Sequence, residues 1–375
     1  MNVAIVHDWL TGMRGGEKCL EVFCELFPEA TIFTLLYNKG FVSEVIERMR
    51  IKTSFIQHLP YAQTKYRNYL PLFPKAVESF SLKDFDFVLS SSHCVAKGAK
   101  KSKDAYHICY CYTPMRYIWM FFEQYFGAYP LWKKKLVESF GRRLKEWDLA
   151  TLERVDEFIG ISETVKKRIN NIYRRQASVI YPPVDVDKFC IGDATVKENF
   201  YLCVSALAAY KRIDLIIEAF NKMPDKKIII IGDGDLRQEL GKKIISANIQ
   251  LISWVGNGQL EDLYRKAKAF VYAAEEDFGI APVEAQGCGT PVIAYGEGGV
   301  TETVIPLNGR LEGKNPTGIF FKEQNSNALV SAIEKFEKIE KEFSPANIRN
   351  NALRFSRKNF RDNMKSMLCK KIGNI

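Results

Sequence analysis

Two glutamates flank a predicted strand-to-helix turn in the C-terminal half of the chain. Glu276 follows the apolar run 269–274, which is typical of a buried strand, and Glu284 lies eight positions later on the helix predicted to follow. Ligands of open α/β sheets bind at the carboxyl ends of strands, where the N–H groups of helix N-termini attract phosphates and hydroxyls. Carboxylates at that edge can accept hydrogen bonds from a diol. The pair therefore predicts a polar ligand site, with two solvated glutamates beside an ordinary turn as the alternative.

Short apolar segments alternate with amphipathic ones along the whole chain, which predicts strands alternating with helices. The pattern begins at Val3–His7 and Glu17–Leu26, stops at the stiff segment Tyr181-Pro182-Pro183, and restarts at Phe200–Ser205. We therefore expect an α/β fold with two doubly wound, mostly parallel domains, 1–183 and 184–355. The charged, helical C-terminal stretch is expected to cross back and brace the first domain with residues 356–375.

Composition excludes several classes of protein. The chain has 375 residues, of which 47% are hydrophobic, and no apolar run of about 18 residues that would predict a transmembrane helix. Its N-terminus lacks the basic start of a signal peptide, so we expect the chain to stay in the cytoplasm. The nine cysteines are expected to be free, mostly buried thiols, and no His or Cys spacing predicts a metal site.

The net charge of +10 is concentrated in part in the segment 132–147. There, Lys133, Lys134 and Lys135 precede further cations that alternate with large apolar side chains. This is the pattern of a basic amphipathic helix that lies on an anionic membrane surface. The alternative is a solvated helix face packed on its own domain; no nucleic-acid motif accompanies the charge.

Several short motifs are shared with one family of enzymes. They include Gly15-Gly16-Glu17-Lys18, Tyr112-Thr113-Pro114, Tyr210-Lys211-Arg212, Gly232-Asp233-Gly234, Glu276 through Glu284, and Gly298-Gly299. With these motifs, nearly the whole chain resembles the retaining nucleotide-sugar glycosyltransferases of family 4, which have the GT-B fold. The N-terminal motifs are most similar to mannosyltransferases that build O-antigen and other bacterial surface polysaccharides. The resemblance implies two Rossmann-like domains facing a cleft, the first for the acceptor and the second for the nucleotide sugar.

The resemblance also implies roles for individual residues. Lys211 should pair with the donor diphosphate, Glu276 should hold hydroxyls of the transferred sugar, and Tyr112 should contact that sugar from the first domain. Glu284 should hold the ribose. The other donor-binding residues implied are Gly15, Gly16, Arg212, Gly232, Gly234, Val255, Gly256, Phe278, Gly279 and Ile280.

The implied reaction moves a hexose, best guess mannose from GDP-mannose, to a lipid-linked saccharide with retention at the anomeric carbon. Neither a bound metal nor a cofactor is implied, because cationic side chains and helix N-termini stabilise the leaving diphosphate. The implied partners are the sugar nucleotide, the lipid-linked acceptor and, through the basic segment of the first domain, the inner face of the cytoplasmic membrane. Binding of nucleic acid is not implied.

Two departures from the family pattern leave alternatives open. Ala206 stands where the family has an arginine, so Arg212, Lys18 or Arg14 would have to supply a second cation for the diphosphate. Tyr112 stands where the family has a histidine, and we expect His107 to be a satisfied core residue rather than a substitute. These losses keep open an inactive, glycosyltransferase-like binding subunit. A UDP-sugar donor also remains possible, whereas no acid–base pair supports a sugar-nucleotide epimerase.

Overall fold

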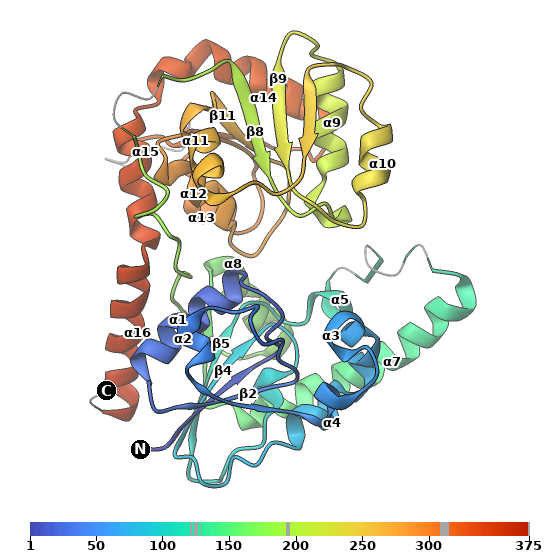
Figure 1. Ribbon diagram of the computed structural model, residues 1–375, viewed down its shortest axis with the longest axis vertical. Helices are drawn as coiled ribbons and strands as arrows, with labels where there is room; N and C mark the ends of the chain where they lie inside the picture. The colour runs from blue at the N-terminus through green and yellow to red at the C-terminus, as the bar shows by residue number, and fades with distance from the viewer. Residues whose placement is uncertain (121, 124–126, 128, 193–195, 308–314, 374–375) are drawn as a thin grey trace. The chain divides into compact units, whose positions relative to one another are not determined.

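The computed structural model describes residues 1–120, 122–123, 127, 129–192, 196–307 and 315–373. The chain divides into two compact units (Figure 1). The N-terminal unit comprises Met1–Pro183 and Phe360–Ile375, and the C-terminal unit comprises Val184–Asn359. Each is described below by itself.

The sheet of the N-terminal unit has seven parallel strands among the described residues, in the order β3-β2-β1-β4-β5-β6-β7. Its central strands are buried on both faces because helices cover both sides, as parallel sheets require. The strands are β1 (Val3–His7), β2 (Thr31–Thr34), β3 (Arg50–Thr53), β4 (Phe87–Ser92), β5 (Tyr106–Cys111), β6 (Glu157–Gly160) and β7 (Ala177–Val179).

The helices of this unit differ greatly in length. The sequence predicts that Ser162 caps a helix, and α8 begins directly after it, with the Ser162 hydroxyl accepting a hydrogen bond from the Val165 N–H at 3.0 Å. Residues of α16 pack on the unit through Phe360, whose ring lies 5.7 Å from that of Phe23. The helices are α1 (Gly15–Leu26), α2 (Glu44–Glu47), α3 (Ala62–Lys65), α4 (Phe73–Glu78), α5 (Arg116–Trp119), α7 (Leu131–Ala150), α8 (Glu163–Arg168) and α16 (Arg357–Ile372).

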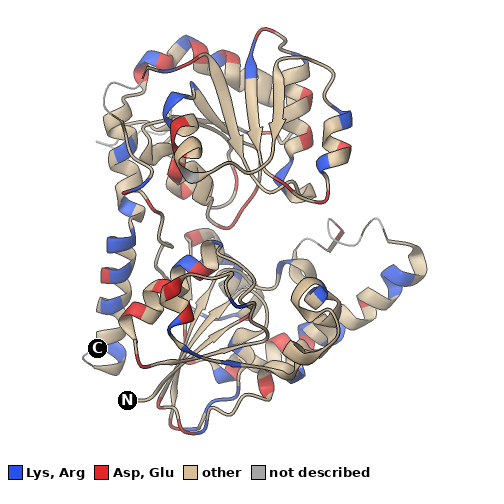
Figure 2. Cartoon of the chain, viewed as in Figure 1, with Lys and Arg blue, Asp and Glu red and all other residues tan. Residues whose placement is uncertain are grey.

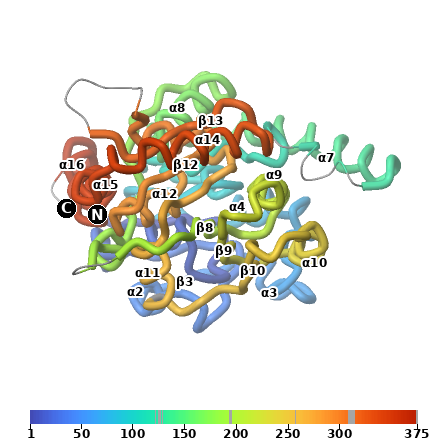
Figure 3. The backbone as a smooth tube through the Cα atoms, turned by 90° about the horizontal axis from the view of Figure 1, so that it is seen from above, coloured from blue at the N-terminus to red at the C-terminus, as the bar shows by residue number. Residues whose placement is uncertain are grey.

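The C-terminal unit is built on six parallel strands among its described residues, in the order β10-β9-β8-β11-β12-β13. Helix α14 covers β12 and β13 (Figure 3) and buries Leu329, Ile333 and Phe336. The strands are β8 (Phe200–Val204), β9 (Lys227–Ile231), β10 (Ile249–Ile252), β11 (Ala269–Tyr272), β12 (Val292–Tyr295) and β13 (Gly318–Phe321). The helices are α9 (Ile213–Asn221), α10 (Arg237–Lys242), α11 (Asn257–Lys266), α12 (Ile280–Gly287), α13 (Val300–Thr303), α14 (Ser326–Ile339) and α15 (Pro345–Ala352).

The predicted fold class is confirmed, although some element boundaries were wrong. The sequence predicts a helix over 211–220, whereas α9 begins at Ile213, because Arg212 has a left-handed backbone with φ of 53° that interrupts the helix. Strands β2, β3 and β13 were not predicted from the sequence; β3 lies at the sheet edge and is only half-buried, so it lacks an apolar run. The last two residues of the predicted C-terminal helix, 374–375, lie outside the described residues.

Candidate active site

The strand order places the candidate residues of the C-terminal unit at a topological switch point. After β8 the chain adds β9 and β10 on one side, then returns to add β11, β12 and β13 on the other. The loops that follow β8 and β11 therefore leave neighbouring strands in opposite directions and open a crevice, where ligands of such sheets bind. Lys211 lies in the loop after β8 and Glu276 in the loop after β11.

Lys211 and Glu276 meet at this edge of the sheet. The Lys211 ammonium donates to a carboxylate oxygen of Glu276, and the two side chains are 13% and 16% exposed. The other Glu276 oxygen accepts a hydrogen bond from the Tyr272 hydroxyl. The sequence-predicted pair is thus brought together and largely shielded from water, so that its charges interact more strongly than they would in bulk solvent.

The loop that carries Glu276 is clamped by the segment 298–299. The Gly299 N–H donates to the Glu276 carbonyl at 2.7 Å, and Gly298 forms a parallel bridge with Glu276. A Cβ on Gly299 would lie 2.4 Å from the Asp277 carbonyl oxygen, and a Cβ on Gly298 2.4 Å from the Glu276 oxygen. Only glycine allows this close backbone approach. The Gly298-Gly299 motif therefore positions the Glu276 side chain from a distant part of the sequence.

Glu284 is held half-buried on α12 by a tyrosine from a neighbouring helix. The Tyr264 hydroxyl of α11 donates to Glu284 Oε2 at 3.2 Å. Burial, together with the negative charge of Glu284, raises the pKa of Tyr264 well above its ordinary value, so the hydroxyl keeps its proton and remains a donor. One carboxylate oxygen is thereby oriented, as recognition of a vicinal diol requires.

The N-terminus of α12 lies in the sequence between the two carboxylates. Phe278 is buried against Phe355, with ring centroids 5.4 Å apart, and Gly279 has φ of 90° and acts as the N-cap residue. The helix begins at Ile280, so the N–H groups of its first turn have no partner within the helix and carry partial positive charge. The predicted donor residues Phe278, Gly279 and Ile280 thus form the turn at which this helix begins.

The remaining predicted donor residues of this unit occupy the neighbouring loops. Arg212 is engaged with its own unit, since it donates to Asp214 at 3.2 Å and to the Gln324 side chain at 3.1 Å. Gly232 directly follows β9. A Cβ at this position would lie 1.8 Å from the Ser205 carbonyl oxygen, so only glycine leaves room for the backbone of the loop after β8. Gly256 is the N-cap of α11, with Val255 before it.

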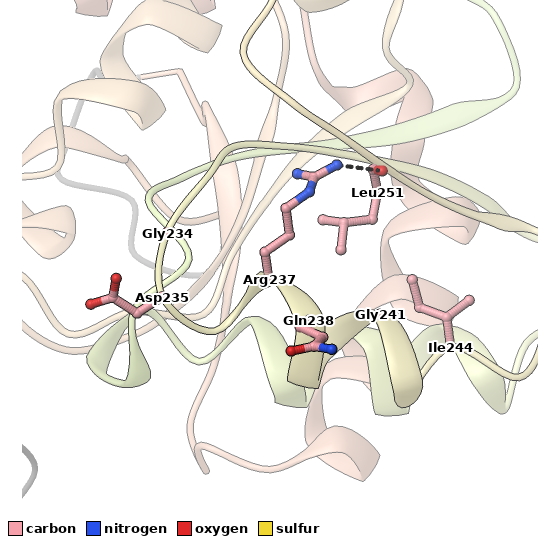
Figure 4. A pocket seen from close by; sticks show the side chains of 7 residues that line it. All are labelled: Gly234, Asp235, Arg237, Gln238, Gly241, Ile244 and Leu251. Atoms are coloured by element: carbon pink, nitrogen blue, oxygen red, sulfur yellow. Dashed lines mark hydrogen bonds between the residues drawn. The ribbon is translucent and has the colours of Figure 1, made fainter.

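A hollow of about 630 Å³ lies beside Gly234, along α10 (Figure 4). Its lining includes Asp235, Arg237, Ile244 and Leu251. The Arg237 guanidinium is committed to the backbone, since it donates to the carbonyls of Gly232 at 2.9 Å and Leu251 at 3.4 Å. Arg237 is therefore already hydrogen-bonded to the protein's own backbone and is not available to bind an anion in this hollow.

The N-terminal unit has its own switch point, between β1 and β4, and a buried carboxylate ties the two strand ends together. Asp8 is fully buried, and its two oxygens accept four backbone N–H groups from residues 93–96 at 2.7–2.9 Å. Burial alone would raise the pKa of Asp8, but the charge and hydrogen bonds of His93, 3.1 Å away, lower it below its usual value. Asp8 is thus ionised and fixes the loop after β4.

A hydrogen-bonded chain connects the glycine loop to the same switch point. His7 Nδ1 lies 2.9 Å from the Ser91 hydroxyl, which lies 2.8 Å from the Tyr112 hydroxyl. The Tyr112 hydroxyl donates to the Gly16 carbonyl at 3.0 Å, at the start of α1 after Gly15. Burial raises the pKa of Tyr112 well above its ordinary value, so the group is neutral. Tyr112 is therefore placed under the glycine loop as a positioning residue.

The expectation for His107 is confirmed. Its ring is fully buried, with Nδ1 2.8 Å from the Arg154 carbonyl and Nε2 2.8 Å from the Ser90 hydroxyl. Burial lowers the pKa of His107 to about 4, so the ring is neutral at physiological pH. Most cysteines are buried, and all nine are free thiols. Among the described residues, no group of three or more His, Cys, Asp or Glu side chains is arranged to hold a metal ion.

Three contributors to these sites were missed from the sequence. The Tyr272 hydroxyl binds Glu276, and the Tyr264 hydroxyl binds Glu284. The Asp8 carboxylate fixes the loop after β4. A tyrosine four residues before a candidate glutamate, and an aspartate directly after a buried strand, are the signals that could have identified two of them.

Comparison with known proteins identifies the C-terminal unit. Residues 191–355, less than half of the chain, match the family model described as glycosyl transferases group 1. An uncharacterized glycosyltransferase of Methanocaldococcus jannaschii is 31% identical over 166 residues, which cover 43% of this chain and 46% of that protein. The D-inositol 3-phosphate glycosyltransferase of Mycobacterium tuberculosis is 33% identical over 148 residues, covering 34% of this chain and 30% of that protein. The match therefore spans less than half the length of these curated relatives.

Solved structures are similar over the whole chain. Anabaena HepE in complex with UDP aligns with a TM-score of 0.70 at 16% identity, covering 99% of this chain and 100% of that one. Sucrose-phosphate synthase from Thermosynechococcus elongatus aligns with a TM-score of 0.72 at 15% identity, covering 99% of each chain. At such identity the likeness establishes the fold alone. The chain has the two-unit GT-B fold, and residues 191–355 match the model of glycosyl transferases group 1.

Proposed function

We propose that the protein is a retaining glycosyltransferase that moves a hexose from a nucleotide diphosphate sugar to an acceptor hydroxyl. The observation that carries the proposal is the contact between Lys211 and Glu276 at the switch point of the C-terminal sheet, in the loop that leads into α12 and its Glu284. A cation, a helix N-terminus and two carboxylates are the groups that a sugar nucleotide requires.

The roles follow from the chemistry of the bond that breaks. As the anomeric C–O bond opens, negative charge grows on the diphosphate and positive charge on the sugar ring. Lys211 and the first-turn N–H groups of α12 stabilise the diphosphate, while the Glu276 carboxylate holds a hydroxyl of the sugar. Glu284 accepts hydrogen bonds from the ribose. Donor binding exchanges the Lys211–Glu276 contact for contacts to the ligand. In this proposal no metal ion takes part.

Two donors are candidates. The motifs of the N-terminal half favour GDP-mannose, because they resemble those of O-antigen mannosyltransferases. A UDP-sugar is favoured by a different observation: solved structures of Anabaena HepE, which shares the fold, hold UDP-glucose or UDP. Glu284 recognises the ribose, which is common to both, so the choice depends on the base and the sugar.

We further propose that the acceptor is a lipid-linked saccharide used in surface polysaccharide synthesis, and that α7 places the protein on the inner face of the cytoplasmic membrane. Leu131, Trp132 and Leu136 of α7 are 79%, 67% and 63% exposed. Lys133 and Lys135 lie among them, and Figure 2 shows Lys and Arg gathered at this end of α7. No helix among the described residues is long and apolar enough to cross a membrane.

The inner end of α7 is anchored to the N-terminal unit. Lys97 and Asp148, 2% and 0% exposed, form an ion pair at 2.8 Å, and Trp147 donates to Glu78 at 2.9 Å. The inner end of the helix is thus fixed in the core, whereas its outer end, residues 131–136, presents apolar and basic side chains together. Such a surface suits the boundary between headgroups and acyl chains of an anionic bilayer.

The test is turnover with defined donors. Purified protein is incubated with GDP-mannose and with a panel of UDP-sugars, and release of nucleoside diphosphate is followed with and without membrane extract. Acceptor-dependent release from one donor is expected, with the anomeric configuration retained in the product. Tight nucleotide binding without release under any acceptor would instead identify a binding subunit.

A further inference from the structure

A cavity of about 730 Å³ lies in the N-terminal unit, outside the groups discussed so far. Its size is that of a small-molecule site. Its lining comes from three segments, namely Thr11 and Arg14, then 38–41, then 63–68. These segments follow β1, β2 and β3, which are adjacent parallel strands, so the cavity lies at the carboxyl edge where α/β sheets bind ligands.

Backbone contacts hold the three segments together. The Asn38 N–H donates to the Leu10 carbonyl at 2.8 Å, and the Ser43 N–H to the Met13 sulfur at 3.3 Å. The Asn38 side chain then donates to the Gln63 carbonyl at 3.3 Å. The walls are therefore bound to one another and do not depend on a ligand for their arrangement.

The lining is strongly basic. Arg14, Lys39, Lys65 and Arg67 belong to it and no Asp or Glu does. In the described part of the chain, none of these four cations is in an ion pair; Lys65 and Arg67 lie over the rings of Tyr61 and Tyr66 instead. The Glu47 carboxylate accepts hydrogen bonds from the Gly40 N–H at 2.8 Å and from the Tyr37 hydroxyl, but Glu47 is not part of the lining. Unpaired cations around a concave surface attract an anion with more than one charge.

Two polar atoms of lining residues are shielded from water and lack a hydrogen-bond partner among the described residues. Tyr66 is 6% exposed, and its hydroxyl has no hydrogen-bond partner among the described residues; the same holds for Asn38 Oδ1. Buried polar groups are normally paired, so these two require explanation. Asn38 Oδ1 can only accept a hydrogen bond, which a fully ionised phosphate cannot donate and a sugar hydroxyl can.

The ring of Tyr66 also connects the cavity to the switch point. Trp9 lies between them, with its ring centroid 5.1 Å from that of Tyr66 and 4.5 Å from that of His93. Arg14 directly precedes the glycine loop at the start of α1. A ligand in the cavity is therefore adjacent to the loop that faces the reaction in the proposed function.

We infer that this cavity binds the phosphate or diphosphate ester of the acceptor saccharide. The cations hold the phosphate, with Arg67 or Arg14 able to bind two oxygens at once, and Tyr66 and Asn38 hold sugar hydroxyls. This assignment of the ligand as the acceptor rests on the proposed function.

Calorimetric titration of the full-length protein tests the inference. The protein is first saturated with the nucleoside diphosphate that it binds, so that the donor site is filled. The probes are the 1-phosphates of glucose, mannose and N-acetylglucosamine, with the free sugars and inorganic phosphate for comparison. At least one sugar phosphate is expected to bind more than tenfold more tightly than its free sugar and than inorganic phosphate.

Matched variants distinguish binding of the sugar phosphate in this cavity from general electrostatic attraction of an anion to a basic protein. The triple variant Lys39→Ala, Lys65→Ala, Arg67→Ala is expected to raise the Kd at least tenfold. The control removes the same charge from exposed positions elsewhere in the unit, Lys75→Ala, Lys83→Ala, Lys103→Ala, and should change the Kd less than twofold. Equal weakening by both triples, or no binding of any sugar phosphate to the wild type, would overturn the inference.

The Tyr66→Phe variant gives an independent readout. Because its hydroxyl has no partner in the unliganded protein, its removal should leave Tm unchanged or higher while raising the Kd about three- to tenfold. A lowered Tm with unchanged Kd would contradict the role assigned to this hydroxyl.

The source of the phosphate is settled by a parallel measurement with vesicles carrying a prenyl diphosphate-linked sugar. Binding that is tighter there, and still lost in the pocket variant, identifies a lipid-linked ligand; equal binding identifies a free sugar phosphate. Donor binding and turnover are measured on the same preparations. Sugar phosphate binding without turnover of any donor would refute the proposed function, whereas turnover without such binding would refute only the inference.

Discussion

Replacing Lys211 by methionine separates the catalytic role proposed for its ammonium from its contribution to stability. In the unliganded protein the ammonium pairs with Glu276, and both side chains are more than four-fifths buried. Methionine retains most of the aliphatic length and removes the charge. The variant therefore removes the cation from the diphosphate while leaving the packing of the loop after β8 largely intact.

The expected magnitudes differ for the two properties. Loss of one preorganised charged donor to a leaving oxyanion costs about 2.7–4 kcal/mol, so kcat should fall roughly 10²- to 10³-fold. Stability should fall by only about 1–2 kcal/mol, less than the 3–5 kcal/mol typical of a fully buried pair, because the Tyr272 hydroxyl still donates to Glu276. For a unit of this size the Tm should drop by roughly 2–8 °C.

The assay combines nucleotide release with thermal unfolding. A double variant, Lys211→Met with Glu276→Gln, should recover part of the lost Tm because no unpaired charge remains, and should recover none of the lost kcat. Lys222→Met is the matched control, since Lys222 also pairs with a glutamate, Glu218, but at an exposed position. A kcat within threefold of the wild type, or a kcat that returns with Tm in the double variant, would refute the reasoning.

Three other predictions concern the ribose, the N-terminal switch point and the membrane surface. Glu284→Ala should raise KM for the donor roughly 10- to 100-fold with a smaller change in kcat, because it removes charged hydrogen bonds to the ribose. Asp8→Asn should lower stability at pH 7 by about 3 kcal/mol, measured by urea unfolding, and flatten its dependence on acid pH. Changing the three lysines at 133–135 to glutamate should reduce sedimentation with anionic liposomes, most at low salt, since each lysine contributes about 1 kcal/mol.

The sign of the pH effect follows from the direction of the Asp8 shift. Its pKa is lower in the folded than in the unfolded state, so ionised Asp8 stabilises the protein above the unfolded pKa of about 4. That stability is lost as the pH falls through the lower folded pKa. A wild-type protein whose stability rose on acidification through this range would contradict the assignment. For the liposome measurement, Lys242→Glu, Lys243→Glu and Lys335→Glu in the C-terminal unit together are the control for net charge, and equal losses would remove α7 as the contact.

Periodicity was enough to predict two α/β domains with parallel sheets, and strand-end chemistry indicated Glu276 and Glu284, whereas Lys211 was predicted only from the family resemblance. The apolar run 269–274 and the loop after it placed Glu276 at a strand end, and the parallel order of β8 and β11 then brings Lys211 beside it. These features can be predicted from sequence because strand burial and loop chemistry both depend on a stretch of about ten residues.

The contacts that set the geometry could not be obtained this way, because they join residues far apart in sequence. Asp8 receives its hydrogen bonds from residues 93–96, and Tyr112 reaches Gly16 across 96 positions. The basic cavity is assembled from two loops and the short helical segment 63–68, and none of the three stretches predicts a site by its own sequence. The basic side chains that line it are brought together by the strand order β3-β2-β1, and two of those strands, β2 and β3, were not predicted.

A crystal structure of the protein soaked with GDP-mannose or a UDP-sugar tests the central claim most directly. The account predicts a ribose within hydrogen-bond distance of Glu284 and a diphosphate in contact with both Lys211 and the first turn of α12, with Lys211 moved from Glu276. A nucleotide bound elsewhere, for example along α10 beside Arg237, with the Lys211–Glu276 contact unbroken, would contradict it.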